Sequence, residues 1–194
     1  SNEIIASLET LRTLKKYIDP DSEGRNWSDT SRMVIDGRAA FQVMGDWVKS
    51  EFINAGKIPG KDFLCAPSPG SSGTLTLVSD AFVMGNITDK NQRKIQEDLA
   101  ITMMDKEVQT RFNLIKGSVP PRTDVSSERF DTCAQIAISV ISSGGTTVPG
   151  FNMANTGMIG SGIISALFNF WNTPEMAPEE AAKMLVEALT SAKL

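Results

Sequence analysis

The stretch Gly37-Arg-Ala-Ala-Phe-Gln-Val-Met-Gly-Asp-Trp47 decides the fold class, because the spacing of its apolar residues changes within it. Apolar side chains recur at every second position from Ala39 to Val43, which predicts a strand over residues 38–44. Helical spacing resumes over residues 47–55, after a short loop at Gly45-Asp46. A strand that leads through a short loop into a helix is typical of α/β proteins, so we expect that fold class.

The rest of the chain continues this alternation, with helices in the majority. Short β-rich runs predict further strands over residues 63–66, 75–78 and 81–84. Apolar spacing, caps and breakers predict helices over residues 3–18, 28–36, 89–104, 105–116, 127–142, 158–171 and 178–192. The sequence therefore indicates a helix-rich α/β protein without internal repeats. The strands are few for a complete sheet of this type, which favours a missing upstream part.

Composition excludes several classes of function. The 194 residues include no histidine, which excludes Ser-His-Asp and Cys-His catalysis and any zinc site that contains histidine. The formal net charge is −4 and both signs are mixed along the chain, so we expect no nucleic-acid partner. The two cysteines, Cys65 and Cys133, are too few for an all-thiolate zinc site. They fit either two free buried thiols or one disulfide, and the residues alone leave both open.

The longest apolar stretch runs from Met158 to Trp171. It is shorter than the about 20 residues that cross a bilayer, so we expect a buried helix and no membrane span. Gly157, Gly160 and Gly162 do not have the spacing of a nucleotide-binding glycine loop. We interpret these small residues as positions where the helix packs closely against a neighbour.

Two tryptophans and two aspartates are the candidates for ligand binding. Trp27 lies in a polar loop and Trp47 follows a predicted strand end, where α/β proteins place their sites. An indole beside hydrogen-bonding groups suits the apolar face of a sugar, although core packing is the alternative. Asp46 and Asp80 can accept hydrogen bonds from sugar hydroxyls, with a helix N-cap and a turn as their alternatives. The same pair of carboxylates would also be needed by a glycosidase.

Several segments together resemble the sugar-binding proteins of bacterial ABC importers of the glucose/mannose type. They are residues 37–47, Gly56-Lys-Ile-Pro-Gly-Lys-Asp-Phe63, Pro67-Ser-Pro-Gly70, Ser79-Asp-Ala-Phe82, Phe151-Asn-Met-Ala154 and Leu167-Phe-Asn-Phe-Trp171. The resemblance covers nearly the whole chain and corresponds to the carboxy-terminal half of such a protein. It implies part of a two-lobed periplasmic-binding-protein fold of type II, whose amino-terminal portion is missing. Residues 1–78 and 125–194 would belong to the carboxy-terminal lobe and residues 79–124 to the amino-terminal lobe.

The resemblance also implies roles for single residues. Trp47 would stack on the sugar ring, Trp27 would form a second aromatic wall, and Asp80 would accept hydrogen bonds from hydroxyls. Phe151 stands where the family often has a histidine, so the preferred sugar would differ or the ring would stack on it. Asn152 is a further polar candidate beside it.

The function implied is capture of a mono- or oligosaccharide between two lobes and its delivery to the permease subunits in the membrane, without a cofactor or turnover. Such proteins work in the periplasm or outside the cell, where Cys65 and Cys133 would form a disulfide. Two alternatives remain. One is a glycoside-processing enzyme that uses Asp46 and Asp80, and the other is a fragment that binds a protein partner and dimerises or swaps segments.

Overall fold

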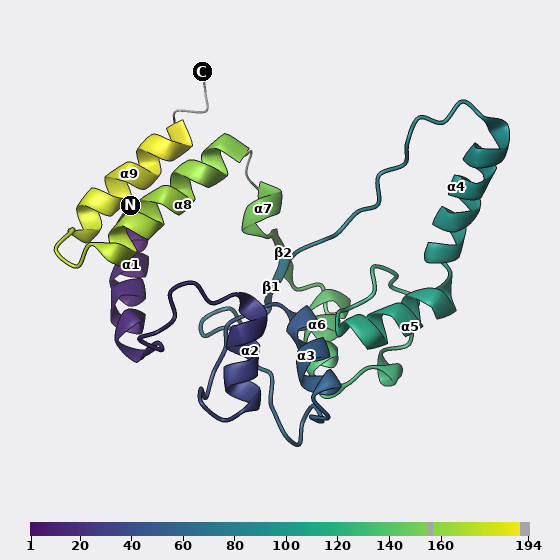
Figure 1. The fold of residues 1–194 in the computed structure, drawn as a ribbon, viewed down its shortest axis with the longest axis horizontal. Helices are drawn as coiled ribbons and strands as arrows, with labels where there is room; N and C mark the ends of the chain where they lie inside the picture. The colour runs from purple at the N-terminus through teal and green to yellow at the C-terminus, as the bar shows by residue number, and fades with distance from the viewer. Residues whose placement is uncertain (155–156, 191–194) are drawn as a thin grey trace. The chain divides into compact units, whose positions relative to one another are not determined.

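The computed structural model describes residues 1–154 and 157–190 (Figure 1). The chain divides into one unit made of Ser1–Gly24 and Pro149–Leu194 and a second unit made of Arg25–Val148. The predicted lobes, residues 1–78, 79–124 and 125–194, concern the complete two-lobed protein and stay a prediction. None of the helices in the described ranges is long and apolar enough to cross a membrane.

The first unit is helical. Its elements are α1 (Asn2–Leu14), the 3-10 turn η1 (Lys15–Tyr17), α7 (Phe151–Ala154), α8 (Gly157–Asn172) and α9 (Pro178–Thr190). The buried residues of its core are Leu8, Phe170, Ala181 and Ala182. A Cβ atom added to Gly162 would lie 2.9 Å from Cβ of Ala188, so α8 and α9 approach closely at this glycine. The interpretation of Gly162 as a close-packing position is confirmed, and the predicted helix end at residues 191–192 lies outside the described residues.

Basic side chains from α1 and η1 bind the carboxyl end of α8. The Arg12 guanidinium donates to the carbonyl oxygens of Phe170, Thr173, Pro174 and Met176, and it lies 4.0 Å from the centroid of the Phe170 ring. Lys15 donates to the carbonyl of Trp171. The last carbonyls of a helix have no partner within the helix and carry partial negative charge. These cations therefore satisfy the end of α8 and fasten α1 to it.

We expect Arg12→Met to lower the free energy of unfolding by about 2 kcal/mol, because the carbonyls that Arg12 binds lose a charged donor. Urea denaturation of the purified chain measures this value. The matched control is Lys16→Met, which removes an exposed cation one turn further along. Equal effects of the two substitutions would contradict this role of Arg12.

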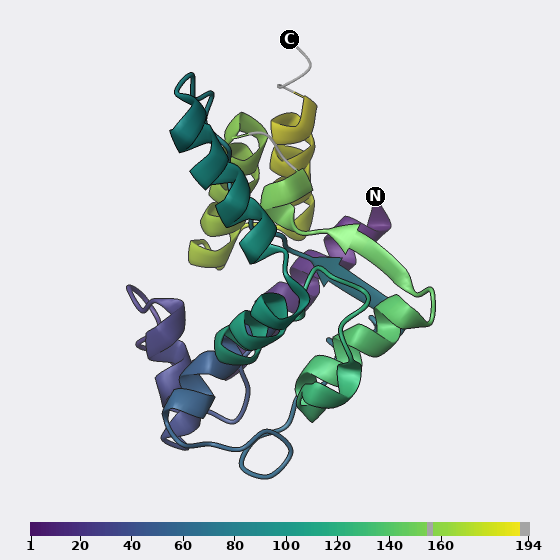
Figure 2. The same ribbon diagram turned by 90° about the vertical axis from the view of Figure 1, so that its right-hand side faces the viewer.

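The second unit combines helices with a two-stranded sheet. Its elements are α2 (Trp27–Ile35), η2 (Asp46–Val48), α3 (Lys49–Asn54), β1 (Thr74–Leu77), α4 (Lys90–Met103), α5 (Lys106–Lys116), η3 (Ser127–Arg129), α6 (Thr132–Ser142) and β2 (Thr146–Pro149). β1 and β2 lie side by side (Figure 1, Figure 2). The backbone N–H of Thr146 donates to the carbonyl of Gly73 at 2.9 Å, which joins the starts of the two strands. The strands are therefore parallel, and the predicted helix-rich α/β class is confirmed at this level.

Three predicted strands are wrong in the described structure. Residues 38–44 and 81–84 are irregular, and residues 63–66 contain a single isolated bridge, from Phe63 to Pro59. A strand needs a partner for its backbone groups, and the described part of the chain offers none to these segments. Their apolar side chains are consequently exposed, with Phe41 at 91% and Val83 at 94%. Conversely, β2 covers Thr146–Pro149, where the sequence predicts no strand.

Most predicted helices are confirmed, and the differences have local causes. Asp89 and Asp105 accept hydrogen bonds from the first backbone N–H groups of α4 and α5 as N-caps. Gly117 ends α5 in the left-handed region. The helix predicted over residues 127–142 is interrupted, because Asp131 takes an extended conformation and begins α6 as its N-cap.

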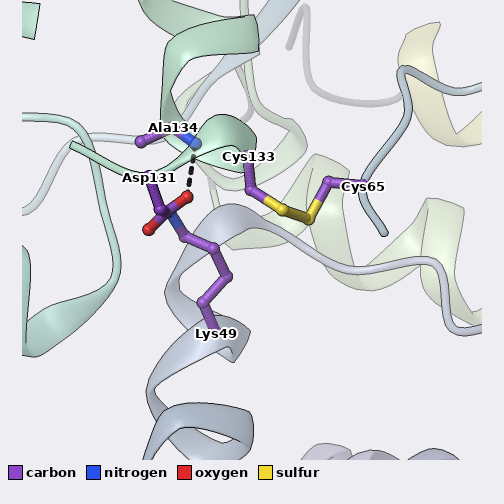
Figure 3. The surroundings of a disulfide bond; sticks show 5 residues. All are labelled: Lys49, Cys65, Asp131, Cys133 and Ala134. Carbon is purple, nitrogen blue, oxygen red and sulfur yellow. Dashed lines mark hydrogen bonds and ion pairs between the residues drawn. A yellow bond between two sulfur atoms is a disulfide. The ribbon is translucent and has the colours of Figure 1, made fainter. Parts of the chain in front are cut away.

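The predicted disulfide between Cys65 and Cys133 is confirmed, with 5.3 Å between the two Cα atoms (Figure 3). Cys133 is buried in the first turn of α6, whereas Cys65 lies in the loop that follows α3. The bond closes a loop with a sequence separation of 68 residues. It therefore anchors a segment without regular structure to the start of a helix.

We expect the double substitution of Cys65 and Cys133 by alanine to lower the free energy of unfolding by about 4 kcal/mol, because the unfolded chain regains the freedom of the long loop. Chemical denaturation measures the difference. Addition of a reductant should reproduce the loss in the parent chain and leave the double variant unchanged. If the reductant also destabilised the double variant, the loss of stability would not come from the Cys65–Cys133 bond.

Candidate functional site

The turn Gly45-Asp46-Trp47 lies between α2 and α3 in the chain and carries the indole ring of Trp47. The ring of Trp47 folds back over Gly45, since a Cβ atom at Gly45 would lie 2.1 Å from Cζ3 of the indole. Trp47 is half-buried, so part of the ring stays accessible. The small residue at position 45 is therefore required by the orientation of this ring.

Asp46 connects this turn to the end of α5. Its Oδ2 accepts a hydrogen bond from the backbone N–H of Val119 at 3.1 Å. Burial raises the pKa of the Asp46 carboxyl, and the nearby charges of Lys49 and Lys116 oppose that rise. The expected alternative of a helix N-cap is wrong, because Gly45 occupies the N-cap position of η2. The side chain instead joins two turns that are far apart in the sequence.

Asp80 pairs with the last residue of α5. Nζ of Lys116 lies 2.8 Å from Oδ2 of Asp80, whose side chain is 79% exposed. The hydrogen bond and charge of Lys116 lower the pKa of the Asp80 carboxyl, which stays ionised. The charge of Lys116 also lowers the pKa of the Asp46 carboxyl, so one ammonium influences both candidate aspartates. Asp46, Trp47, Lys116 and Asp80 form what we call the charged turn cluster.

The other predicted site residues belong to other elements of the fold. Trp27 is the first residue of α2, which packs against α3, and its side chain is 44% exposed. Phe151 and Asn152 belong to α7 in the first unit. The Phe151 ring comes within 3.8 Å of a Cβ atom added to Gly160, so it covers the start of α8. Asn152 is exposed.

The described residues hold no group of three or more cysteine, aspartate and glutamate side chains that would bind a metal ion. The charged turn cluster contains one indole, one ammonium and two carboxylates, of which Asp80 pairs with Lys116 and Asp46 directly precedes Trp47 in the chain. Such an arrangement can stack on an apolar ring and exchange hydrogen bonds with hydroxyl groups around it. It has the chemistry of a carbohydrate contact.

Relatives of the chain carry names that agree with this chemistry. A probable sugar-binding periplasmic protein of Brucella suis is 35% identical over 198 residues, which cover 100% of this chain and 47% of the relative. A protein of the same name in Rhizobium meliloti is 36% identical over 193 residues, covering 96% of this chain and 46% of the relative. This chain is a homologue of periplasmic sugar-binding proteins. No protein-family model matches it.

The similarity extends to a relative with lower identity. An uncharacterised ABC transporter extracellular-binding protein of Pyrococcus horikoshii is 32% identical over 154 residues, covering 75% of this chain and 34% of the relative. The chain spans about half the length of the curated relatives it matches, as the 47% coverage of the Brucella suis protein shows. The resemblance stated from the sequence motifs is thus confirmed.

Lys116 is the member of the cluster that sequence reasoning missed in this homologue. Its position directly before Gly117, in the last turn of α5, gives it an ordinary role at the negative end of the helix dipole. Only the fold shows that its ammonium reaches Asp80, which lies 36 positions earlier in the chain. A charged residue at a helix end next to a tight turn is the signal that could have suggested it.

We expect Gly45→Ala to displace the Trp47 ring and to lower the free energy of unfolding by about 2 kcal/mol, because the added methyl group overlaps the indole. Fluorescence of a Trp27→Phe, Trp171→Phe background, in which Trp47 is the remaining tryptophan, reports the displacement. The control is Gly85→Ala, whose Cβ would meet Gln96 at an ordinary 3.7 Å. Unchanged Trp47 emission in the Gly45 variant would contradict the role of the glycine.

Proposed function

We propose that this chain is part of the substrate-binding component of an ABC-type carbohydrate importer. The single observation that carries the proposal is the charged turn cluster, in which the half-buried Trp47 directly follows Asp46 and the Lys116 ammonium pairs with Asp80 in the same unit. The names of the relatives support a solute-binding role and a periplasmic location. The sugar would be a mono- or oligosaccharide, and the working location the periplasm or the cell exterior.

Each group in the cluster has a proposed task. The Trp47 indole stacks on the apolar C–H face of the sugar. Asp80 accepts and Lys116 donates hydrogen bonds to hydroxyl groups, since a carboxylate and an ammonium form strong charge-assisted bonds. The exposed ion pair between them contributes little to stability, so a sugar can insert its hydroxyls at small cost. Asp46 adds a carboxylate held in place by Val119.

The remaining predicted contacts complete the proposal. Trp27 would form a second aromatic wall, and Phe151 and Asn152 would be further sugar contacts. The phenyl ring of Phe151 cannot donate a hydrogen bond, so we expect a preference for a sugar that is less polar at this point. Closure of two lobes on the sugar, with residues 79–124 in the amino-terminal lobe, would produce the form that docks on the permease.

The enzyme alternative has one observation in its favour. Asp46 has a raised pKa and Asp80 a lowered one, which is the pattern of a general acid and its partner carboxylate. The Asp46 carboxylate, however, is engaged by a backbone N–H, and the relatives are named as binding proteins. We therefore expect no hydrolysis of a chromogenic glycoside by the parent chain. Hydrolysis that disappears in Asp46→Asn or Asp80→Asn would contradict the proposed function.

The interaction alternative rests on the exposed apolar segments 38–44 and 81–84. A chain that used them to dimerise or to swap segments would be larger than a monomer in light scattering. A sugar-binding role does not depend on that result. Measuring molecular size and sugar binding on the same preparation therefore separates the interaction alternative from the proposed sugar-binding function.

We expect the chain to bind a hexose or disaccharide from a panel with a dissociation constant of about 1 mM, because one side of the site supplies only part of the contacts. NMR titration of the indole N–H signals measures the affinity and shows which tryptophan responds. The Trp47 signal should shift, and Trp47→Phe should abolish the binding that Trp171→Phe leaves intact.

Asp80→Asn should weaken the sugar affinity about tenfold, since the charged acceptor and the partner of Lys116 are lost together. Asp124→Asn is the matched control, because Asp124 is also exposed and paired with a basic residue, Arg122. Absence of any response to the whole panel at Trp47 would overturn the assigned site. Micromolar affinity of this chain alone would overturn the proposal that a second lobe supplies the rest of the contacts.

A further inference from the structure

A buried ammonium stands directly after the turn that carries Trp47. Lys49 is the first residue of α3, its side chain is 2% exposed, and its Nζ lies 2.9 Å from both carboxylate oxygens of Asp131. Withdrawing an ammonium from water is costly unless a carboxylate pairs with it. An apolar pair of the same size would fill this space equally well. The choice of charged residues here therefore calls for a reason other than stability.

The partner of Lys49 is immobilised from several directions. Oδ1 of Asp131 also accepts the backbone N–H of Ala134 at 2.9 Å, as the N-cap of α6. Cys133, between them in the first turn, is bonded to Cys65. Figure 3 shows Lys49 reaching up to Asp131 next to this bond. The start of α6 is thus a rigid anchor for the ammonium.

The opposite side of Lys49 is packed against the end of α5. A Cβ atom at Gly117 would lie 3.1 Å from Cβ of Lys49 and 3.3 Å from the carbonyl oxygen of Asp46. Asp46 in turn accepts the N–H of Val119, two residues after that glycine. The residues that precede α3 are therefore held between the end of α5 and the start of α6.

We propose that Lys49 and Asp131 are positioning residues for sugar binding: their buried ion pair fixes the Asp46-Trp47 turn in the orientation that presents the indole and the carboxylate to the ligand. This proposal rests on the proposed function. The bidentate contact fixes the direction of the Lys49 side chain, and the covalent bond at Cys133 fixes the helix to which Asp131 belongs. The positive charge of Lys49 also favours the ionised form of the Asp46 carboxylate, which burial disfavours.

The test removes the charges and keeps the volume. In Lys49→Met, Asp131→Asn no buried charge is left unpaired, and asparagine can still cap α6. We expect the chain to stay folded, its sugar affinity to fall about tenfold, and the emission of Trp47 to shift in the Trp27→Phe, Trp171→Phe background. The pKa of Asp46, followed by NMR, should rise, with Lys116 as the cation that still acts on it.

The matched control is Lys94→Met, Asp98→Asn. This pair has the same geometry, with Nζ 2.9 Å from both oxygens, but it is exposed on α4. It should change neither the sugar affinity nor the Trp47 signal. A second variant, Asp131→Glu, retains both charges and moves the anchor by one methylene, so it should shift the emission even if the neutral pair fails to fold.

Unchanged emission and an unchanged Asp46 pKa in a folded neutral pair would overturn the positioning role, as would a native Trp47 signal in Asp131→Glu. These two readouts need no sugar. They therefore separate failure of this inference from failure of the proposed function, in which the parent chain itself would show no response of Trp47 to any sugar.

Discussion

A buried ammonium has to be matched by a carboxylate, and in the second unit this requirement joins three distant segments of the chain. Lys49 begins α3, Asp131 begins α6, and Gly117 at the end of α5 closes over the Lys49 stem. None of these segments is bonded to the others through a sheet. The Lys49–Asp131 ion pair therefore joins α3 to α6 without a sheet, and packing against Gly117 adds the end of α5.

Polar groups carry much of the remaining organisation of this unit. The buried polar residues among those described are Ser31, Lys49, Gln109, Thr110 and Asn113. Asn113 donates to Gln109 within α5 and accepts the hydroxyl of Ser118 beyond the helix end. Satisfied polar contacts are directional, whereas apolar packing tolerates sliding. Polar contacts of this kind therefore fix the orientation of the elements that carry Asp46 and Lys116, in addition to stabilising the fold.

The sequence predicts local structure well where the causes are local. Asp89, Asp105 and Gly117 act on backbone groups within a few residues, so helix ends follow from the sequence alone. Strands are different, because Phe41 and Val83 alternate correctly yet have no neighbour in the described chain to pair with. The residues alone leave open whether Cys65 and Cys133 are free thiols or a disulfide, and the disulfide is expected only from the oxidising compartment that the family resemblance implies.

The same distinction applies to the candidate site. Trp47 and Asp46 are proposed from sequence because an aromatic and a carboxylate follow a predicted strand end, although that strand is absent from the described structure. Lys116 and Asp131 are missed, because their importance depends on partners 36 and 82 positions away. A lysine at the end of a helix and an aspartate at the start of one are both favoured at those places. Their ordinary local roles conceal the second contact that each of them makes.

Two segments of the second unit expose apolar side chains that would normally be buried. Phe41, Val43, Phe82 and Val83 lie in segments whose composition suits a buried sheet, yet they are largely exposed. The chain spans about half the length of its curated relatives. In the proposed function, one aromatic face with charged groups contacts only one side of a sugar, and binding has to offset the lost freedom of the ligand. The second lobe of that proposal would therefore supply both the remaining sugar contacts and a cover for these apolar segments.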